Sequence, residues 1–305
     1  MPAPLRLLDL TTGIDQAIEG FETRLRAQGR SELTISAYMR DLRCFARALP
    51  ATGIECITPA IIDAALTDPA VACSENGAPK SAATMHRLKA VVRSFFAWAE
   101  ESGLAGTNAA RSVRMKRLTR TPPDYLTEAE KRRLLKELHD RANPLARRDR
   151  VIFELFLGTG IRIAELVNLD IDHMDVDGKH IRITGKGGIP QVKFLKTTLR
   201  TLLRDYLKER RKVTAPDCTA VFVSSRGTRL SARQIAQRLS IWLGKAGITK
   251  NITPHGLRHT FATHLYSSTS NLLLVKRALG HADISTTEIY THLADDTLED
   301  ALERL

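Results

Sequence analysis

Apolar residues recur at helical spacing through the first third of the chain. Ser31 and Thr58 stand where helix caps are expected, and Pro59 fits the first position of a helix. Gly103 is a typical residue for ending the last of these segments. The pattern predicts a small bundle of helices at residues 14–28, 31–49, from 58 onward, and 81–101.

The helical periodicity stops between Asn108 and Tyr125. Five basic residues and no acidic residue lie between Thr107 and Thr121, and the pair Pro122 and Pro123 follows. A basic, proline-stiffened segment of this kind is typical of a linker between domains. We therefore predict a helical domain at 1–107, a linker at 108–125 and a second domain at 126–305.

The second domain opens on a capping box, in which Thr127 caps a helix and Glu130 occupies its third position. Further on, residues 180–184 and 191–195 alternate between polar and apolar side chains, with a glycine-rich turn between them. Lys186 is expected at the tip of this hairpin. A short strand at 221–223 and helices at 231–246 and 254–267 complete the prediction: a mainly α fold with a small β-ribbon, of the α+β type.

The composition adds a preference for a polyanionic partner. The 305 residues include 46 Lys and Arg against 34 Asp and Glu, a net charge of +12. Such an excess favours binding to nucleic acid through its phosphates, although a generally basic protein would show it too. Four scattered cysteines lack the spacing of a zinc site. Apolar runs fall short of a membrane span of about 20 residues, and the N-terminus lacks a signal-peptide pattern; we expect a cytoplasmic protein.

Two clusters of residues could bind a phosphodiester. Arg162 follows Gly160 at an expected helix start, where Glu165 lies on the same face and can orient it. His255 and Arg258 are three positions apart in a predicted helix, so that both could meet one phosphate. Arginine suits this task because its planar guanidinium contacts two oxygens and stays charged.

A third cluster contains a possible nucleophile. His281 follows Gly280, which is expected to end a helix, and Tyr290 lies within the first turns of the next predicted helix. A tyrosine at such a position is usually a packing residue, and His259 and His264 are also expected to be packed. The nearby arginines and histidines favour a catalytic tyrosine instead.

These motifs together resemble the tyrosine recombinases of the Xer and phage-integrase family. The resemblance covers the whole chain in order and spacing. It implies a helical core-binding domain and a catalytic domain that form a C-shaped clamp on DNA. The chain departs from the family at residues 267–274, which replace a glycine-containing turn. The motifs that carry the resemblance are Thr159 to Leu166, Thr253 to Leu265, and Leu279 to His292.

The resemblance also implies a role for each site residue. Arg162 and Arg258 would bind the scissile phosphate, and Glu165 would support Arg162. Lys186 would protonate the departing 5′ oxygen, with Lys179 and Lys193 as alternatives. His255 would assist proton transfer, His281 would hydrogen-bond the phosphate, and Tyr290 would form a 3′-phosphotyrosyl bond. No metal or other cofactor is implied.

The implied partners are a double-stranded DNA site and further protomers in a synaptic tetramer, which could include a second related recombinase. The acidic segment 296–305 places Leu298, Leu302 and Leu305 on one face, and we expect it to dock on a neighbouring subunit. Alternatives are a transposon- or phage-borne integrase or resolvase, a type IB topoisomerase, and a DNA-binding regulator that does not cut.

Overall fold

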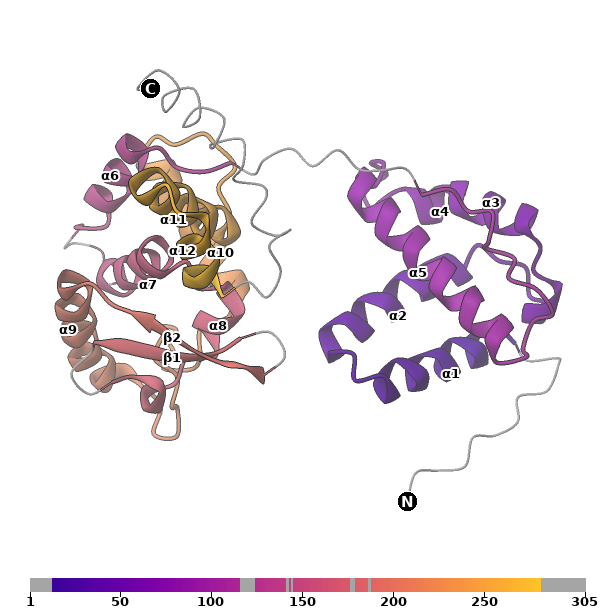
Figure 1. The fold of residues 1–305 in the computed structure, drawn as a ribbon, viewed down its shortest axis with the longest axis horizontal. Coiled ribbons are helices and arrows are strands. Elements are labelled where there is room, and N and C mark those ends of the chain that lie inside the picture. The colour runs from indigo at the N-terminus through magenta and orange to yellow at the C-terminus, as the bar shows by residue number, and fades with distance from the viewer. Residues whose placement is uncertain are drawn as a thin grey trace. The chain divides into compact units, whose positions relative to one another are not determined.

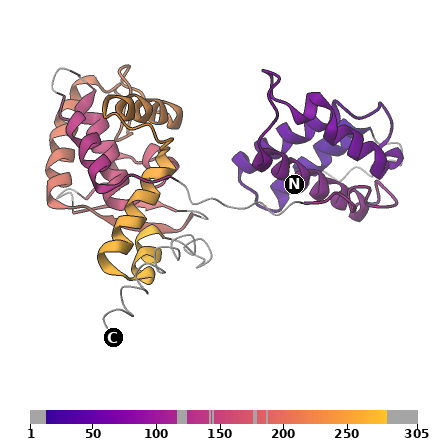
Figure 2. The same ribbon diagram turned by 90° about the horizontal axis from the view of Figure 1, so that it is seen from above.

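The computed structural model describes residues 13–115, 124–140, 143, 145–175, 179–185 and 188–280. The chain forms two compact units, Met1–Arg120 and Thr121–Leu305, which we call the N-terminal and C-terminal units. Both are helical in the two views of the ribbon (Figures 1 and 2). The predicted fold class, mainly α with a small β-ribbon, is confirmed.

The helices of the N-terminal unit begin at capping residues. The side chains of Ser31, Thr58 and Ser81 each accept a hydrogen bond from a backbone N–H in the first helical turn, which satisfies a donor that has no partner within the helix. Gly103 takes the left-handed conformation just after the last helix. The helices are α1 (Ile14–Ala27), α2 (Glu32–Ala46), α3 (Pro59–Thr67), α4 (Pro69–Ala72) and α5 (Ala82–Glu101), with a short 3₁₀ turn at Ile54–Cys56.

Aromatic side chains form the centre of this unit. Phe95 and Phe96 on α5 are fully buried, and Phe95 packs edge to face against Phe21 of α1, with ring centroids 5.6 Å apart. This geometry is favourable for aromatic pairs. The aromatic residues of α5 therefore belong to the core, as their place on the apolar stripe predicts.

The C-terminal unit combines helices with a two-stranded antiparallel ribbon. Strand β1 pairs with β2, so that Ile181 faces Lys193 and Ile183 faces Gln191. Figure 1 shows the ribbon with α8 next to it. The elements are α6 (Glu128–Glu137), α7 (Ala146–Thr159), α8 (Ile163–Val167), a 3₁₀ turn (Ile171–His173), β1 (His180–Thr184), β2 (Pro190–Phe194), α9 (Thr197–Val213), α10 (Ala232–Lys245), α11 (Pro254–Thr269) and α12 (Leu272–Leu279).

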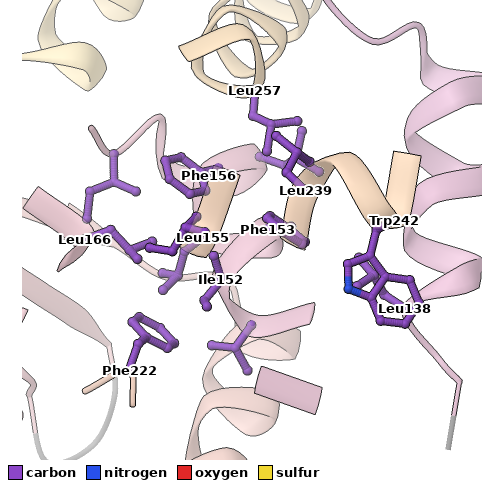
Figure 3. Close-up of a cluster of buried hydrophobic side chains, with 14 of the residues drawn as sticks. Leu138, Ile152, Phe153, Leu155, Phe156, Leu166, Phe222, Leu239, Trp242 and Leu257 are labelled. Atoms are coloured by element: carbon purple, nitrogen blue, oxygen red, sulfur yellow. The ribbon is translucent and has the colours of Figure 1, made fainter. Parts of the chain in front are cut away.

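Helix α7 is the central element of this unit. Its apolar residues are buried along most of its length, and it packs against α9 and α11. Phe153 lies in one cluster with Leu239 and Trp242 of α10 (Figure 3). A helix that is apolar on several faces can be stable only inside such a core. This burial gives α7 a fixed position, and the first arginine motif follows directly at its C-terminal end.

A buried carboxylate joins α7 to α10. Asp149 is fully buried and accepts hydrogen bonds from Arg148 (2.7 Å), from Arg238 Nε (2.6 Å) and from Trp242 Nε1 (2.8 Å). Several donors around one carboxylate offset the loss of its hydration.

Within the residues that the structure describes, no helix combines the length and the apolarity needed to cross a membrane.

Three local expectations differ from the structure. Helix α2 ends at Ala46 rather than at residue 49. The stretch 221–223 does not form a regular strand: its last residue, Val223, makes an isolated bridge to Arg229, and the preceding Ala220 makes one to Asp170. The unusual turn after α11 needs no glycine, since Ser270 itself adopts the left-handed conformation with φ 48°.

Candidate active site

The first arginine stands where α7 ends and α8 begins. Gly160 ends α7 in the left-handed conformation, with φ 61°. A Cβ at this position would collide with Phe261 and Leu279, so the turn requires glycine for both its conformation and its close packing. Gly158 and Thr159, expected in the turn, belong to the last turn of α7. Arg162 is the N-cap of α8 rather than a residue of its first turn.

The carboxylate of Glu165 accepts hydrogen bonds from both the backbone and the side chain of Arg162. The backbone N–H of Arg162 donates to Glu165 Oε2 at 2.8 Å, and its Nη1 donates to Oε1 at 2.7 Å. The side chain of Glu165 is buried, whereas that of Arg162 is 34% exposed. The predicted contact is therefore present, and it leaves part of the guanidinium open to a ligand.

The second arginine is supplied by α11. Thr253 caps this helix by accepting from the N–H of Gly256, and Pro254 occupies the first turn. Arg258 lies one turn further on and is only 3% exposed. Its Nη1 donates to the carbonyl of Gly160, and its Nη2 donates to the carbonyl of Leu279 at 2.8 Å. Arg258 thus joins the end of α7 to the end of α12.

His255 lies in the same electrostatic environment as both arginines. Partial loss of solvent, followed by the positive charges of Arg258 and Arg162, lowers the pKa of its imidazole. Its ring meets that of His259 edge to face, with centroids 4.5 Å apart. His259 is buried, as expected for a packing residue. The structure therefore brings together Arg162, Glu165, His255 and Arg258 from separate elements.

Lys193 is a buried cation whose burial the alternation of polar and apolar residues in β2 does not predict. On β2 the apolar Val192 and Phe194 are exposed, whereas Lys193 is 5% exposed and points inward. Burial, followed by the positive charge of Arg258, lowers the pKa of Lys193 to about 8. The sequence suggests Lys193 only as an alternative to Lys186. The sequence of β2 holds no signal that would have identified it, because the alternation of a strand does not say which of its two faces is covered.

Lys186, His281 and Tyr290 lie outside the described residues, but the residues just before two of them are described. Gly185 ends the paired part of β1, and Gly280 ends α12 in the left-handed conformation, as predicted. A Cβ on either glycine would collide with the side chain of Gln191. Gln191 therefore lies against the residues that precede both Lys186 and His281 in the chain.

Comparisons with protein families agree with the resemblance seen in the sequence. Residues 124–297 match the phage integrase family, and residues 18–103 match the N-terminal SAM-like domain of phage integrases. The tyrosine recombinase XerC of Serratia marcescens is 34% identical over 93% of this chain and 92% of its own length. XerC of Vibrio vulnificus strain YJ016 is 35% identical over 97% and 92%.

Solved structures show the same fold. The XerH site-specific recombinase, in a post-cleavage complex with a palindromic difH substrate, matches with a TM-score of 0.72 and 23% identity over 93% of this chain and 83% of that one. A lambda integrase tetramer bound to a Holliday junction matches with a TM-score of 0.69 and 19% identity over 90% and 79%. The family match covers more than half of the chain, and the curated relatives cover nearly all of it. The chain belongs to the phage integrase family and is a tyrosine recombinase.

Proposed function

We propose that this protein is a site-specific recombinase that exchanges DNA strands through a 3′-phosphotyrosyl intermediate and a Holliday junction. Membership of the tyrosine recombinase family supports cleavage and rejoining of DNA. The observation that carries the proposal is the convergence of Arg162 and Arg258 from two separate elements of one unit. Two guanidinium groups near one another can bind one DNA phosphate together, and its negative charge offsets their mutual repulsion.

In the proposed cleavage step, Arg162 and Arg258 bind the nonbridging oxygens of the scissile phosphate. The hydroxyl oxygen of Tyr290 forms a bond to phosphorus and gives up its proton, while the bond from phosphorus to the 5′ oxygen breaks. Lys186 gives a proton to that oxygen. Negative charge increases on the phosphate in the transition state, so the preorganised arginines stabilise it more than they stabilise the substrate.

His255 and His281 complete this scheme. The lowered pKa of His255 keeps its imidazole neutral at pH 7, so it can accept a proton during the reaction. His281 hydrogen-bonds a phosphate oxygen. In the second half of the exchange, a 5′ hydroxyl from the partner duplex attacks the phosphotyrosyl bond and releases Tyr290. The bond energy is conserved throughout, and no metal or nucleotide takes part in the scheme.

We propose that both domains, 1–107 and 126–305, contact the DNA, and that the basic linker 108–125 follows its backbone. Five basic residues and no acidic residue between Thr107 and Thr121 favour contact with phosphates. Four protomers would assemble on two synapsed sites, and a second related recombinase could supply two of them. A lambda integrase, a protein of the same fold, has been solved as a tetramer bound to a Holliday junction, which supports a tetramer here.

The decisive experiment is covalent trapping on DNA. A site is first selected from a library of random duplexes, and it is then rebuilt as a nicked suicide substrate that cannot be religated. We expect an adduct that resists denaturation, forms in the presence of EDTA and is absent with Tyr290→Phe. An adduct that persists in Tyr290→Phe would overturn the assignment of the nucleophile.

Two controls accompany this experiment: a second tyrosine variant tests the assignment of the nucleophile, and plasmid assays separate recombination from simple relaxation. Tyr266 is a buried tyrosine of α11 that takes no part in the scheme, so Tyr266→Phe should still form the adduct. Efficient relaxation of supercoiled plasmids that lack the selected site would favour a topoisomerase. Exchange between two plasmids that both carry the site would support a recombinase.

A further inference from the structure

The proposed reaction gives no role to Lys193, a buried cation in the electrostatic environment of Arg258 and Arg162. Lys193 stands opposite Ile181 on the inward face of the ribbon and is almost fully buried. On the same strand, Phe194 is 79% exposed. An amphipathic strand normally buries its apolar side chains and exposes its charged ones. Strand β2 does the opposite, so hydrophobic burial does not explain why Lys193 points inward.

Lys193 contacts the C-terminal end of α12. Its Nζ donates a hydrogen bond to the carbonyl of Ala278, and Arg258 Nη2 donates to the next carbonyl, that of Leu279, at 2.8 Å. The last carbonyls of a helix lack partners inside the helix and carry its negative dipole end. Two cations from different elements therefore hold the last turn of α12.

This helix end is the starting point of the segment that carries the remaining site residues. Gly280 follows Leu279 in the left-handed conformation, and the sequence continues with His281 and reaches Tyr290 nine residues later. The same strand that carries Lys193 also contacts Gly280 through Gln191. The ribbon thus contacts the end of α12 at two adjacent points: Lys193 by a hydrogen bond to Ala278, and Gln191 by close packing against Gly280.

The charge of Lys193 has a cost for the fold. Among the described residues, the charged groups that act on it are Arg258 of α11, Arg162 at the start of α8, and Glu165 of α8. The two arginines disfavour the ammonium form and the carboxylate favours it, while burial disfavours it most. An apolar residue opposite Ile181 would avoid this cost. A retained buried charge beside two phosphate-binding arginines points to a functional reason.

We propose that Lys193 is a positioning residue for strand cleavage: its ammonium group fastens the end of α12 to the ribbon, so that the segment carrying His281 and Tyr290 starts from a fixed place beside Arg258. This inference rests on the proposed function, because it needs a cleavage step in which that segment takes part. An anion bound between Arg162 and Arg258 favours the charged form of Lys193, which strengthens its hydrogen bond to Ala278 when DNA is present.

The test compares Lys193→Met and Lys193→Arg with the unchanged protein on the selected suicide duplex. Methionine has similar length but no donor, so we expect single-turnover cleavage at pH 7 to fall roughly 10- to 100-fold, the effect of losing one charge-assisted hydrogen bond. Binding of the same duplex should change less than threefold. Arginine keeps a charged donor, so Lys193→Arg should recover part of the lost rate.

The pH dependence provides a readout that a packing defect would not give. The ratio of the cleavage rate of the unchanged protein to that of Lys193→Met should decrease from pH 7 to pH 10, because Lys193 loses its proton over this range. The ratio of Lys193→Arg to Lys193→Met should stay constant, because arginine stays charged. Ratios cancel the titration of other groups common to both proteins.

Lys208→Met is the matched control, since Lys208 is a largely exposed lysine of α9 and loses the same charge. It should cleave like the unchanged protein. Equal cleavage by Lys193→Met, or a loss of DNA binding as large as its loss of cleavage, would overturn the positioning role. If the unchanged protein itself forms no adduct on the selected duplex, the proposed function fails instead.

Discussion

At the residue scale, the two arginines of the site differ in how the protein uses them. Arg258 is almost completely buried and donates to the carbonyls of Gly160 and Leu279. Arg162 is partly exposed and is held mainly by Glu165. Arg258 therefore joins structural elements while it contributes charge to the site, whereas Arg162 has more of its guanidinium available for a phosphate.

His255 should produce an acidic limb in the pH profile of cleavage, a range in which the cleavage rate falls as the pH decreases. Burial and the two arginines lower its pKa from 6.5, so the imidazole is neutral at pH 7 and becomes charged only below pH 6.5. Because a protonated ring cannot accept a proton, we expect single-turnover cleavage to fall as the pH decreases through this range. His255→Gln should be slower at pH 7 and should lack that limb. An unchanged pH profile in His255→Gln would show that another group causes the limb.

Lys193 should make the C-terminal unit less stable at neutral pH than at alkaline pH. Burial lowers its pKa in the folded protein to about 8, from the ordinary lysine value of 10.5 that holds in the unfolded chain. Between these values the unfolded chain binds more protons, so the free energy of unfolding rises with pH. Lys193→Met should therefore unfold with a free energy about 1–3 kcal/mol higher at pH 7, and this gain should vanish near pH 10.5.

This prediction can be measured in one unit of the chain. The protein has two tryptophans, Trp98 in the N-terminal unit and Trp242 in the C-terminal unit. In a Trp98→Phe background, the fluorescence of Trp242 reports urea unfolding of the C-terminal unit. Lower stability of Lys193→Met at pH 7 would show that its ammonium group stabilises the fold rather than costing stability.

At the element scale, the junction between α7 and α8 decides where Arg162 stands. Helix α7 is fixed by core packing, and Gly160 ends it by turning left. The next residue, Ile161, is fully buried. Arg162 is then placed at the N-cap of α8, where the positive end of the helix dipole adds to the positive potential around its guanidinium. The arrangement depends on a conformation that only glycine adopts at low cost.

Gly160→Ala should disrupt this junction in two ways. Alanine at a positive φ is strained, and its Cβ would collide with Phe261 and Leu279. We expect a loss of about 2–4 kcal/mol in the free energy of unfolding of the C-terminal unit. Cleavage should fall further than stability explains, because the carbonyl of Gly160 also holds Arg258.

Gly247→Ala separates the two effects. Gly247 has φ 63° but nearly open space around its missing Cβ. Its substitution should show only the conformational cost, about 1–2 kcal/mol, with little change in cleavage per folded molecule. Equal effects of the two substitutions on stability and on cleavage would contradict the role of the packed turn.

At the scale of the whole molecule, two units with separate cores are joined by a basic segment. The acidic residues 296–305 lie outside the described residues. Their predicted apolar face, formed by Leu298, Leu302 and Leu305, would need to be covered by another surface. We infer that this surface belongs to a neighbouring protomer.

Deleting 296–305 should therefore preserve binding to a single DNA site and impair synapsis. We expect the affinity for one site to change less than threefold and recombination between two sites to fall more than tenfold, because association of subunits depends on the lost apolar contacts. Gel shifts with one and two sites, together with light scattering, would measure both. Recombination at the full rate would contradict docking of this segment.

Local features of this protein follow from the sequence because they depend on residues a few positions apart. The caps at Ser31 and Thr127, the proline at position 59 and the glycine at 280 each satisfy or redirect a backbone within one helical turn. Helix starts could therefore be predicted closely. The end of α2 could not, because fraying of a helix end depends on packing beyond its own turn.

The residue types of the proposed site, and the helices that carry most of them, could be predicted from the amino-acid sequence because motifs and caps depend on short spacings. Two features could be seen only in the folded chain. Arg258 lies against Gly160, nearly a hundred residues earlier in the sequence, and β2 turns Lys193 rather than Phe194 inward. A strand has two faces, and its own alternation does not say which one is covered. That choice depends on the helix ends and charges that pack against it, and these come together only in the folded chain.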